Sequence, residues 1–174
     1  MNKTMITAAL AGVVAVGALV ALVAATNSQA VSKPAPAAAR SGEQQVRAAN
    51  AAFYTALNAF FTGEMSGIEN IWSHADDVTY MGPAGGMQVG WTAVHANWKM
   101  QAVMKLGGTV EPKDMHVTVG TDIAVTQQVE QGTNTNMEGK PMTVSIRATN
   151  TFRLEGGAWK MIGHHTDLIP VMAK

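Results

Sequence analysis

A long β-strand is predicted between Pro141 and Leu154, where apolar and polar side chains alternate residue by residue. Its apolar face carries Met142, Val144, Ile146, Ala148, Phe152 and Leu154, and its polar face carries Thr143, Ser145, Arg147, Thr149 and Thr151. Because an isolated strand cannot bury its own apolar face, other parts of the chain must form a layer that covers it.

Four more strands and three helices are predicted around this strand. The strands are Met115 to Val119, Ile123 to about Gln131, and Ala158 to Leu168, with a short one near Val78 to Tyr80 before the loop Gly82 to Gly86. Helical spacing of apolar residues predicts helices from the capping box at Ser41 to Gly63, from the box at Ser66 to His74, and from Gly90 or Thr92 to Gly107. Helices followed by an antiparallel meander are typical of an α+β fold.

The first thirty residues differ in composition from the rest of the chain. Lys3 is the only charged residue before Lys33, and residues 8–25 are all Ala, Gly, Val or Leu. This pattern predicts a signal peptide over residues 1–30, and hence a periplasmic or secreted protein. The alternative is an uncleaved anchor in the inner membrane, formed by residues 5–25, because the apolar run is nearly long enough to span a bilayer. Residues 31–42 read as a Pro/Ala-rich linker, and residues 43–170 as the folded domain.

Composition excludes several classes of protein. The chain has no cysteine, which excludes a disulfide framework. Its 12 Lys and Arg balance 12 Asp and Glu, so no basic surface for nucleic acid is expected. Zinc-ligand spacings and phosphate-binding glycine loops are missing from the sequence, and we therefore expect no metal and no cofactor. The expected partner is a small, mostly apolar molecule.

Several motifs occur in a particular order between Val46 and Leu168. They are the helix that ends at Gly63-Glu64, the segment Trp72 to Tyr80 with its glycine-rich loop and Gly90-Trp91, the segment Arg147 to Phe152, and Gly157 to Trp159 with His165. In this order they resemble the nuclear transport factor 2-like superfamily, in particular its SnoaL-like and ketosteroid-isomerase-like bacterial branches. The resemblance implies a cone-shaped, strongly curved antiparallel sheet wrapped on three N-terminal helices, a cavity at the open end, and frequent homodimers.

The superfamily contains isomerases, dehydratases, cyclases and proteins without catalytic activity, so the resemblance leaves open whether this chain is an enzyme. Ketosteroid isomerases carry a catalytic aspartate just before the proline of the loop that follows the first strand. Gly82 stands at that position here, directly before Pro83. Chemistry of that exact type is therefore not expected, although a lyase, cyclase or other isomerase remains open.

Arg147 and His165 are the candidate catalytic residues. The resemblance to association domains of calmodulin-dependent kinases implies that Arg147 lies inside the pocket, where its planar guanidinium would bind an oxyanion. His165 matches a C-terminal histidine of the superfamily, and its neighbour His164 must point to the opposite face of the strand. If the turn after Leu154 places that residue opposite Ala158, Arg147 falls opposite His165.

Four aromatic residues are further candidates for contact with the ligand: Tyr80, Trp72, Trp98 and His95. Each is equally suited to ordinary core packing. The functional hypothesis is an exported SnoaL-like protein that binds a small, mostly apolar molecule in the cone, with or without proton transfer. The alternative hypothesis is a non-catalytic, oligomeric interaction or scaffold domain.

Overall fold

The computed structural model describes residues 37–136 and 138–168. The predicted signal peptide or anchor, residues 1–30, lies outside the described residues. In the described ranges, the structure contains no helix with the length and hydropathy needed to cross a membrane.

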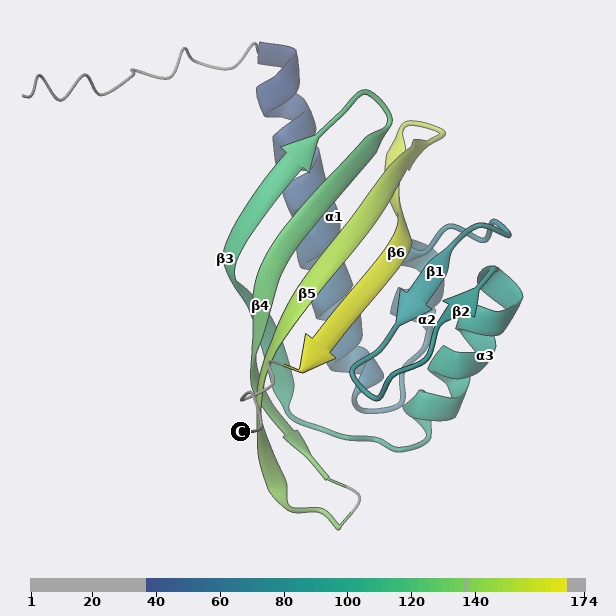
Figure 1. Cartoon of the computed structure of the whole chain (residues 1–174), viewed down its shortest axis with the longest axis vertical. Helices are drawn as coiled ribbons and strands as arrows, with labels where there is room; N and C mark the ends of the chain where they lie inside the picture. The colour runs from purple at the N-terminus through teal and green to yellow at the C-terminus, as the bar shows by residue number, and fades with distance from the viewer. Residues whose placement is uncertain (1–36, 137, 169–174) are drawn as a thin grey trace, which may run out of the picture. The chain divides into compact units, whose positions relative to one another are not determined.

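The described residues form three helices and six strands (Figure 1). In chain order they are α1 (Ala37–Phe60), α2 (Ser66–Ile71), β1 (Thr79–Met81), β2 (Gln88–Val89), α3 (Trp91–Ala102), β3 (Thr109–Val119), β4 (Ile123–Thr135), β5 (Pro141–Glu155) and β6 (Ala158–Leu168).

Most of these elements match the prediction, and the differences have local causes. Helix α1 begins at Ala37, before the expected capping box, so the end of the predicted linker is helical. Strand β3 begins at Thr109 instead of Met115 because an irregularity between Lys113 and His116 interrupts its pairing and hence its alternation. Strand β2 has two residues, too few to produce a recognisable pattern in the sequence.

All six strands form one sheet with the order β2-β1-β6-β5-β4-β3. Strands β3 to β6 form the expected antiparallel meander. Strand β1, however, pairs with β6 in parallel, so the curved sheet is mixed and not purely antiparallel as predicted (Figure 1). The α+β fold class is confirmed.

The register between β5 and β6 differs from the predicted one. Leu154 pairs with Trp159 instead of Ala158, and a bulge between Thr151 and Phe152 shifts the register further. As a result Arg147 lies opposite Asp167. The predicted pairing of Arg147 with His165 is therefore wrong, because the turn and the bulge each displace one strand relative to the other.

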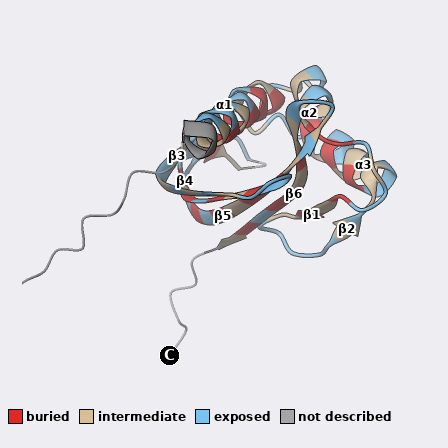
Figure 2. Cartoon of the chain, turned by 90° about the horizontal axis from the view of Figure 1, so that it is seen from above, coloured by how far each residue is buried: buried red, intermediate tan, exposed pale blue. Residues whose placement is uncertain are grey.

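The helices lie on one side of the sheet, and the buried residues are concentrated between the two layers (Figure 2). The largest side chains of this core are almost fully buried: Phe53, Phe60, Trp72, Trp98, Phe152 and Met161. On α3 the residues Val94, Trp98 and Ala102 form the buried face of the helix. Burial of aromatic and aliphatic side chains such as these stabilises a domain by roughly 1.5–3 kcal/mol for each residue.

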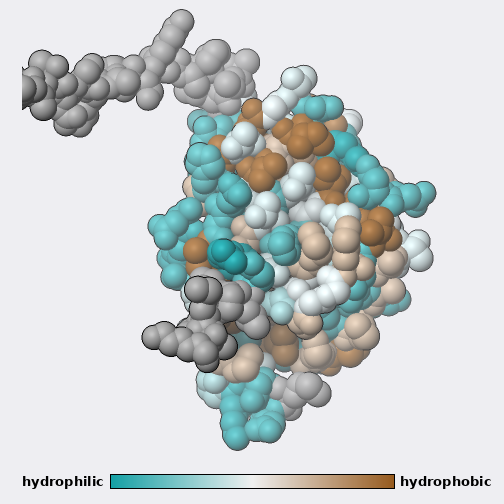
Figure 3. All heavy atoms as spheres, in the orientation of Figure 1, coloured by the Kyte–Doolittle hydropathy of each residue, from teal (hydrophilic) through white to brown (hydrophobic). Residues whose placement is uncertain are grey.

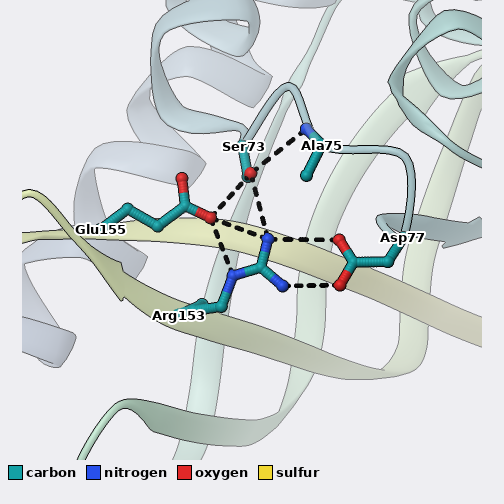
Figure 4. A network of polar contacts seen from close by, with 5 residues as sticks. All are labelled: Ser73, Ala75, Asp77, Arg153 and Glu155. Carbon is teal, nitrogen blue, oxygen red and sulfur yellow. Dashed lines mark hydrogen bonds and ion pairs between the residues drawn. The ribbon is translucent and has the colours of Figure 1, made fainter.

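A polar cluster joins the loop before β1 to the end of β5 (Figure 4). The guanidinium of Arg153 donates to both carboxylate oxygens of Asp77, at 2.7 and 3.2 Å, and its Nε donates to Glu155 at 2.8 Å. The hydroxyl of Ser73 donates to the same oxygen of Glu155 at 2.8 Å. The hydrogen bonds from Arg153 lower the pKa of Asp77, so this carboxylate stays ionised and holds the loop against the sheet.

Candidate functional site

A cavity of about 110 Å³ lies between the sheet and helices α1 and α3. Its wall is mostly apolar, with Leu57, Phe60 and Phe61 from α1 and Trp98 from α3. The polar side chains in the wall come largely from β4 and β6: Glu130, Asn134, His164 and Thr166. An apolar cavity with a few convergent polar groups is the usual form of a small-molecule site.

A chain of hydrogen bonds fixes the imidazole of His164. Its Nδ1 lies 2.6 Å from Oδ1 of Asn150, and Nδ2 of Asn150 donates to Oδ1 of Asn50 at 2.8 Å. The hydroxyl of Thr126 donates to the same Oδ1 of Asn50 at 3.0 Å. Because Asn150 presents its carbonyl oxygen to His164, the proton of the neutral ring must be on Nδ1. This leaves the lone pair of Nε2 free to accept a hydrogen bond.

Glu130 lies across from this free nitrogen. Its Oε1 is 3.9 Å from Nε2 of His164 and accepts a hydrogen bond of 3.0 Å from the hydroxyl of Tyr54. The side chain of Glu130 is buried, and no Lys or Arg of the described residues forms an ion pair with it. A carboxyl group and a neutral imidazole therefore face each other inside the domain.

Burial controls the protonation of both groups. It raises the pKa of Glu130 to about 7, and the hydrogen bond from Tyr54 opposes this rise only in part. It lowers the pKa of His164 to about 3, with a further contribution from the adjacent His165. The rings of Phe53 and Tyr80 pack on the imidazole, with centroids 4.9 and 5.8 Å away, which accounts for the loss of solvent. Near neutral pH, His164 is uncharged and Glu130 is poised between its two forms.

The hydroxyl of Thr166 is a third polar group of the cavity. It is fully buried, and no hydrogen-bond partner for it is found among the described residues. Unpaired buried hydroxyl groups are uncommon, and one that lines a cavity is available to a bound molecule or to water. Three chemical groups therefore meet in one cavity. Glu130 can donate or accept a proton, Nε2 of His164 can accept a hydrogen bond, and the hydroxyl of Thr166 can donate one.

The predicted aromatic candidates separate into two groups. Tyr80 and Trp98 line the cavity. Trp72 is buried in the core, with its ring centroid 6.2 Å from that of Trp98, and is not part of the cavity wall. His95 also lies outside the wall, where its Nε2 contacts Glu69 at 2.7 Å and its ring stacks on Trp91.

Arg147 and His165 face away from the cavity, and the prediction that they line it is corrected here. Both side chains are exposed on the outer face of the sheet, and Arg147 forms an ion pair with Asp167 at 2.6 Å. On β5 and β6 the inward positions belong to residues such as Ala148, Asn150 and His164. The histidine of the cavity is therefore His164, the direct neighbour of the expected one.

Gly82 is the residue that the resemblance to ketosteroid isomerases placed at the position of their catalytic aspartate. A Cβ atom at this position would lie 2.5 Å from the hydroxyl oxygen of Tyr80, much closer than non-bonded atoms approach. A side chain at this position would therefore require the buried ring of Tyr80 to move. The carboxyl group of this cavity comes instead from Glu130 on β4. Hydrophobicity does not point to Glu130, because its neighbour Val129 is apolar and would be expected to face the interior instead.

Comparison with known proteins agrees with this architecture. A candidate dehydratase of the NTF2-like family from Streptomyces avermitilis is 24% identical, with a TM-score of 0.67 over 78% of this chain and 99% of that one. A candidate calcium/calmodulin-dependent protein kinase type II association domain from Thiobacillus denitrificans is 26% identical, with a TM-score of 0.61 over 71% of this chain and 94% of that one. An NTF2-like superfamily protein from Salmonella enterica is 11% identical, with a TM-score of 0.66 over 78% and 98% of the two chains.

No curated protein matches the chain. The family model of the SnoaL-like domain matches residues 46–172, which is most of the sequence. Its fold is the one found in NTF2-like proteins, and the chain belongs to the SnoaL-like domain family.

Proposed function

We propose that this SnoaL-like domain binds a small, mostly apolar carbonyl compound in its cavity and that Glu130 transfers a proton to or from it. The observation that carries this proposal is the buried Glu130 carboxyl group facing the free Nε2 of His164 at 3.9 Å within an apolar wall. A carboxyl group with a pKa of about 7 is suited to both donate and accept a proton near neutral pH.

The ionised form of Glu130 would remove a proton from the carbon next to the carbonyl group of the ligand. The electrons of that C–H bond would then form an enolate, and the hydroxyl of Thr166 is free to donate a hydrogen bond to its oxygen. The protonated Glu130 would return the proton to another carbon, as in an isomerase, or to a departing hydroxyl group, as in a lyase. His164 would accept a hydrogen bond from a hydroxyl group of the ligand and so orient it.

Deuterium exchange into butan-2-one, a ketone small enough for the cavity, tests this proposal, because exchange at the carbons acidified by the carbonyl group needs only binding and proton removal. We expect the purified protein to accelerate the exchange in D₂O, as followed by ¹H NMR. Glu130→Gln should reduce the acceleration by about 10²- to 10⁴-fold, the range of general acid–base catalysis.

Arg147→Ala is the matched control, since Arg147 lies on the outer face of the sheet. This variant should accelerate deuterium exchange into the ketone as much as the parent protein does. Equal rates for Glu130→Gln and the parent would refute the catalytic role of Glu130.

Export of this protein is also part of the proposal, on the basis of the apolar segment 8–25 behind Lys3. Expression of the full chain in a bacterial host with a periplasm should yield a protein in the periplasmic fraction whose N-terminus begins near Val31. The mass of the purified protein measures this directly. An intact N-terminus in the membrane fraction would support the anchor over residues 5–25 instead.

A non-catalytic interaction domain is the second candidate. It is favoured by the 26% identity to a candidate kinase association domain and by Val125, Val129, Thr149 and Thr151, which are only half exposed on the outer face of the sheet. Figure 3 shows this face as a mixture of hydrophilic and hydrophobic residues. A homodimer through it is compatible with ligand binding on the other side of the sheet.

A further inference from the structure

A second hollow adjoins the cavity. Its volume is about 320 Å³, and it lies between the glycine-rich loop and the C-terminal part of α3. The cavity and this outer hollow share four lining residues, Tyr80, Pro83, Gln101 and Leu106. The side chains of these residues therefore stand between the two hollows. We call the outer hollow the methionine groove, after Met100 and Met104 in its wall.

The inner cavity is small for a ligand. Its volume of about 110 Å³ is less than the roughly 150 Å³ of a protein cavity that holds one benzene molecule. Known ligand pockets usually measure about 300–1,000 Å³, a range that is reached here only when the groove is included. The cavity by itself has room for the polar end of a molecule and a few carbon atoms.

The wall of the methionine groove is suited to an apolar chain. None of the described residues that line it is charged. Met100 and Met104 are 63% and 45% exposed, so the groove presents apolar side chains to solvent. Methionine side chains are flexible and polarisable, and they adapt to apolar ligands of varied shape.

The boundary between the two hollows includes one polar pair of side chains, Tyr80 and Gln101. Nε2 of Gln101 donates a hydrogen bond of 3.1 Å to the hydroxyl of Tyr80 and a second one to Oδ1 of Asn97. A rotation of the Gln101 side chain would open the passage without any change in the backbone. The passage would then lead from the exposed groove to Glu130 and His164.

We propose, resting on the function proposed above, that the ligand is a linear amphiphile: a carbonyl head group in the cavity and an unbranched alkyl or acyl tail in the methionine groove. The head contacts Glu130, His164 and Thr166. The tail leaves between Tyr80 and Gln101 and covers Met100 and Met104. The groove therefore determines chain-length specificity, and the cavity determines head-group chemistry.

A series of 2-alkanones from butan-2-one to decan-2-one tests this inference, with dissociation constants measured from the fluorescence of Trp98 and its neighbours. We expect affinity to increase about fourfold for each added methylene group, the increase that burial of one such group provides, until the groove is filled. A dissociation constant that is the same along the series would overturn the inference.

Two surface variants locate the tail. Met100→Gln combined with Met104→Gln keeps the side-chain length at both positions. It should weaken the binding of decan-2-one at least tenfold and leave the binding of butan-2-one unchanged. Val103→Gln is the matched control, because Val103 lies between them, is 77% exposed and does not line the groove. Equal binding of decan-2-one by the double variant and the parent would also overturn the inference.

The two sets of experiments distinguish a failure of the proposed function from a failure of this inference. If affinity rises with chain length and depends on Met100 and Met104, but Glu130→Gln exchanges deuterium as fast as the parent, the tail site stands and the proton transfer does not. If the exchange depends on Glu130 while affinity is independent of chain length, only the tail site is lost.

Discussion

Glu130→Gln should produce a protein whose free energy of unfolding rises by about 5 kcal/mol between pH 3 and pH 6.5. The cause is His164, whose pKa is about 3 in the folded state and has its ordinary value of 6.5 in the unfolded state. A histidine with a lowered pKa contributes stability that is fully present above pH 6.5. This stability is lost as the pH falls toward 3, because the unfolded chain takes up a proton that the folded state cannot accept.

In the parent protein the free energy of unfolding should not rise between pH 4.5 and 6.5, because Glu130 has the opposite effect on it. Its pKa rises from 4.5 to about 7 on folding, so its contribution is complete below pH 4.5 and is lost as the pH rises to about 7. In this window the unfolded chain holds one proton on His164 and the folded chain holds one proton on Glu130. Folding moves the proton from one residue to the other, and the total number of bound protons stays the same.

Urea unfolding at steps of half a pH unit measures both contributions. His164→Gln should expose the reverse slope, with about 3 kcal/mol lost between pH 4.5 and pH 7. Thr149→Ala, on the outer face of the sheet, should follow the parent profile at every pH. A Glu130→Gln variant that is as insensitive to pH as the parent would show that His164 is not buried in its neutral form.

Asn150→Ala is expected to reduce the free energy of unfolding by about 4 kcal/mol. Asn150 is completely buried and joins Nδ1 of His164 to Oδ1 of Asn50. Its removal leaves both of these buried atoms with fewer partners, at about 1–3 kcal/mol each, and leaves a small cavity as well. Urea unfolding at a single pH near 6 measures the loss.

The same variant tests whether Asn150 sets the tautomer of His164. In the parent, ¹⁵N NMR should show the proton of the neutral ring on Nδ1, and in Asn150→Ala the two tautomers should become mixed. Thr149→Ala is again the matched control, since it alters the adjacent residue on the other face of β5 and should change stability by less than about 1 kcal/mol. An unchanged tautomer in Asn150→Ala would mean that another group orients the imidazole.

Much of the fold could be predicted from short-range patterns. The alternation from Pro141 to Leu154 predicted β5 and its buried face. The buried positions Ile146, Ala148 and Phe152 confirm this face in the middle of the strand, whereas Met142 and Leu154 near its ends are exposed. The order of helices and strands led to the superfamily, which the family match confirms. These features depend on residues close together in the sequence, so the side-chain period alone reveals them.

The candidate site could not be predicted in the same way. On β4 the inward face carries Thr126, Gln128 and Glu130, and the outward face carries Val125 and Val129. Hydrophobicity alone assigns the valines to the interior. One signal was present in the sequence, since Asn150 interrupts the apolar face of β5, and a buried polar residue at such a position requires buried polar partners.

The sequence by itself determined most of the elements, their order and the buried face in the middle of β5, because each of these follows from the local period of side chains. Only the tertiary structure decided that His164 and not His165 lies in the cavity. Which of two adjacent residues points toward the core depends on bulges and turns, because each of them shifts the strand register by a single residue. Only the tertiary structure brought Glu130 to His164, because the two come from strands that are not neighbours in the sheet and meet through its curvature over α1.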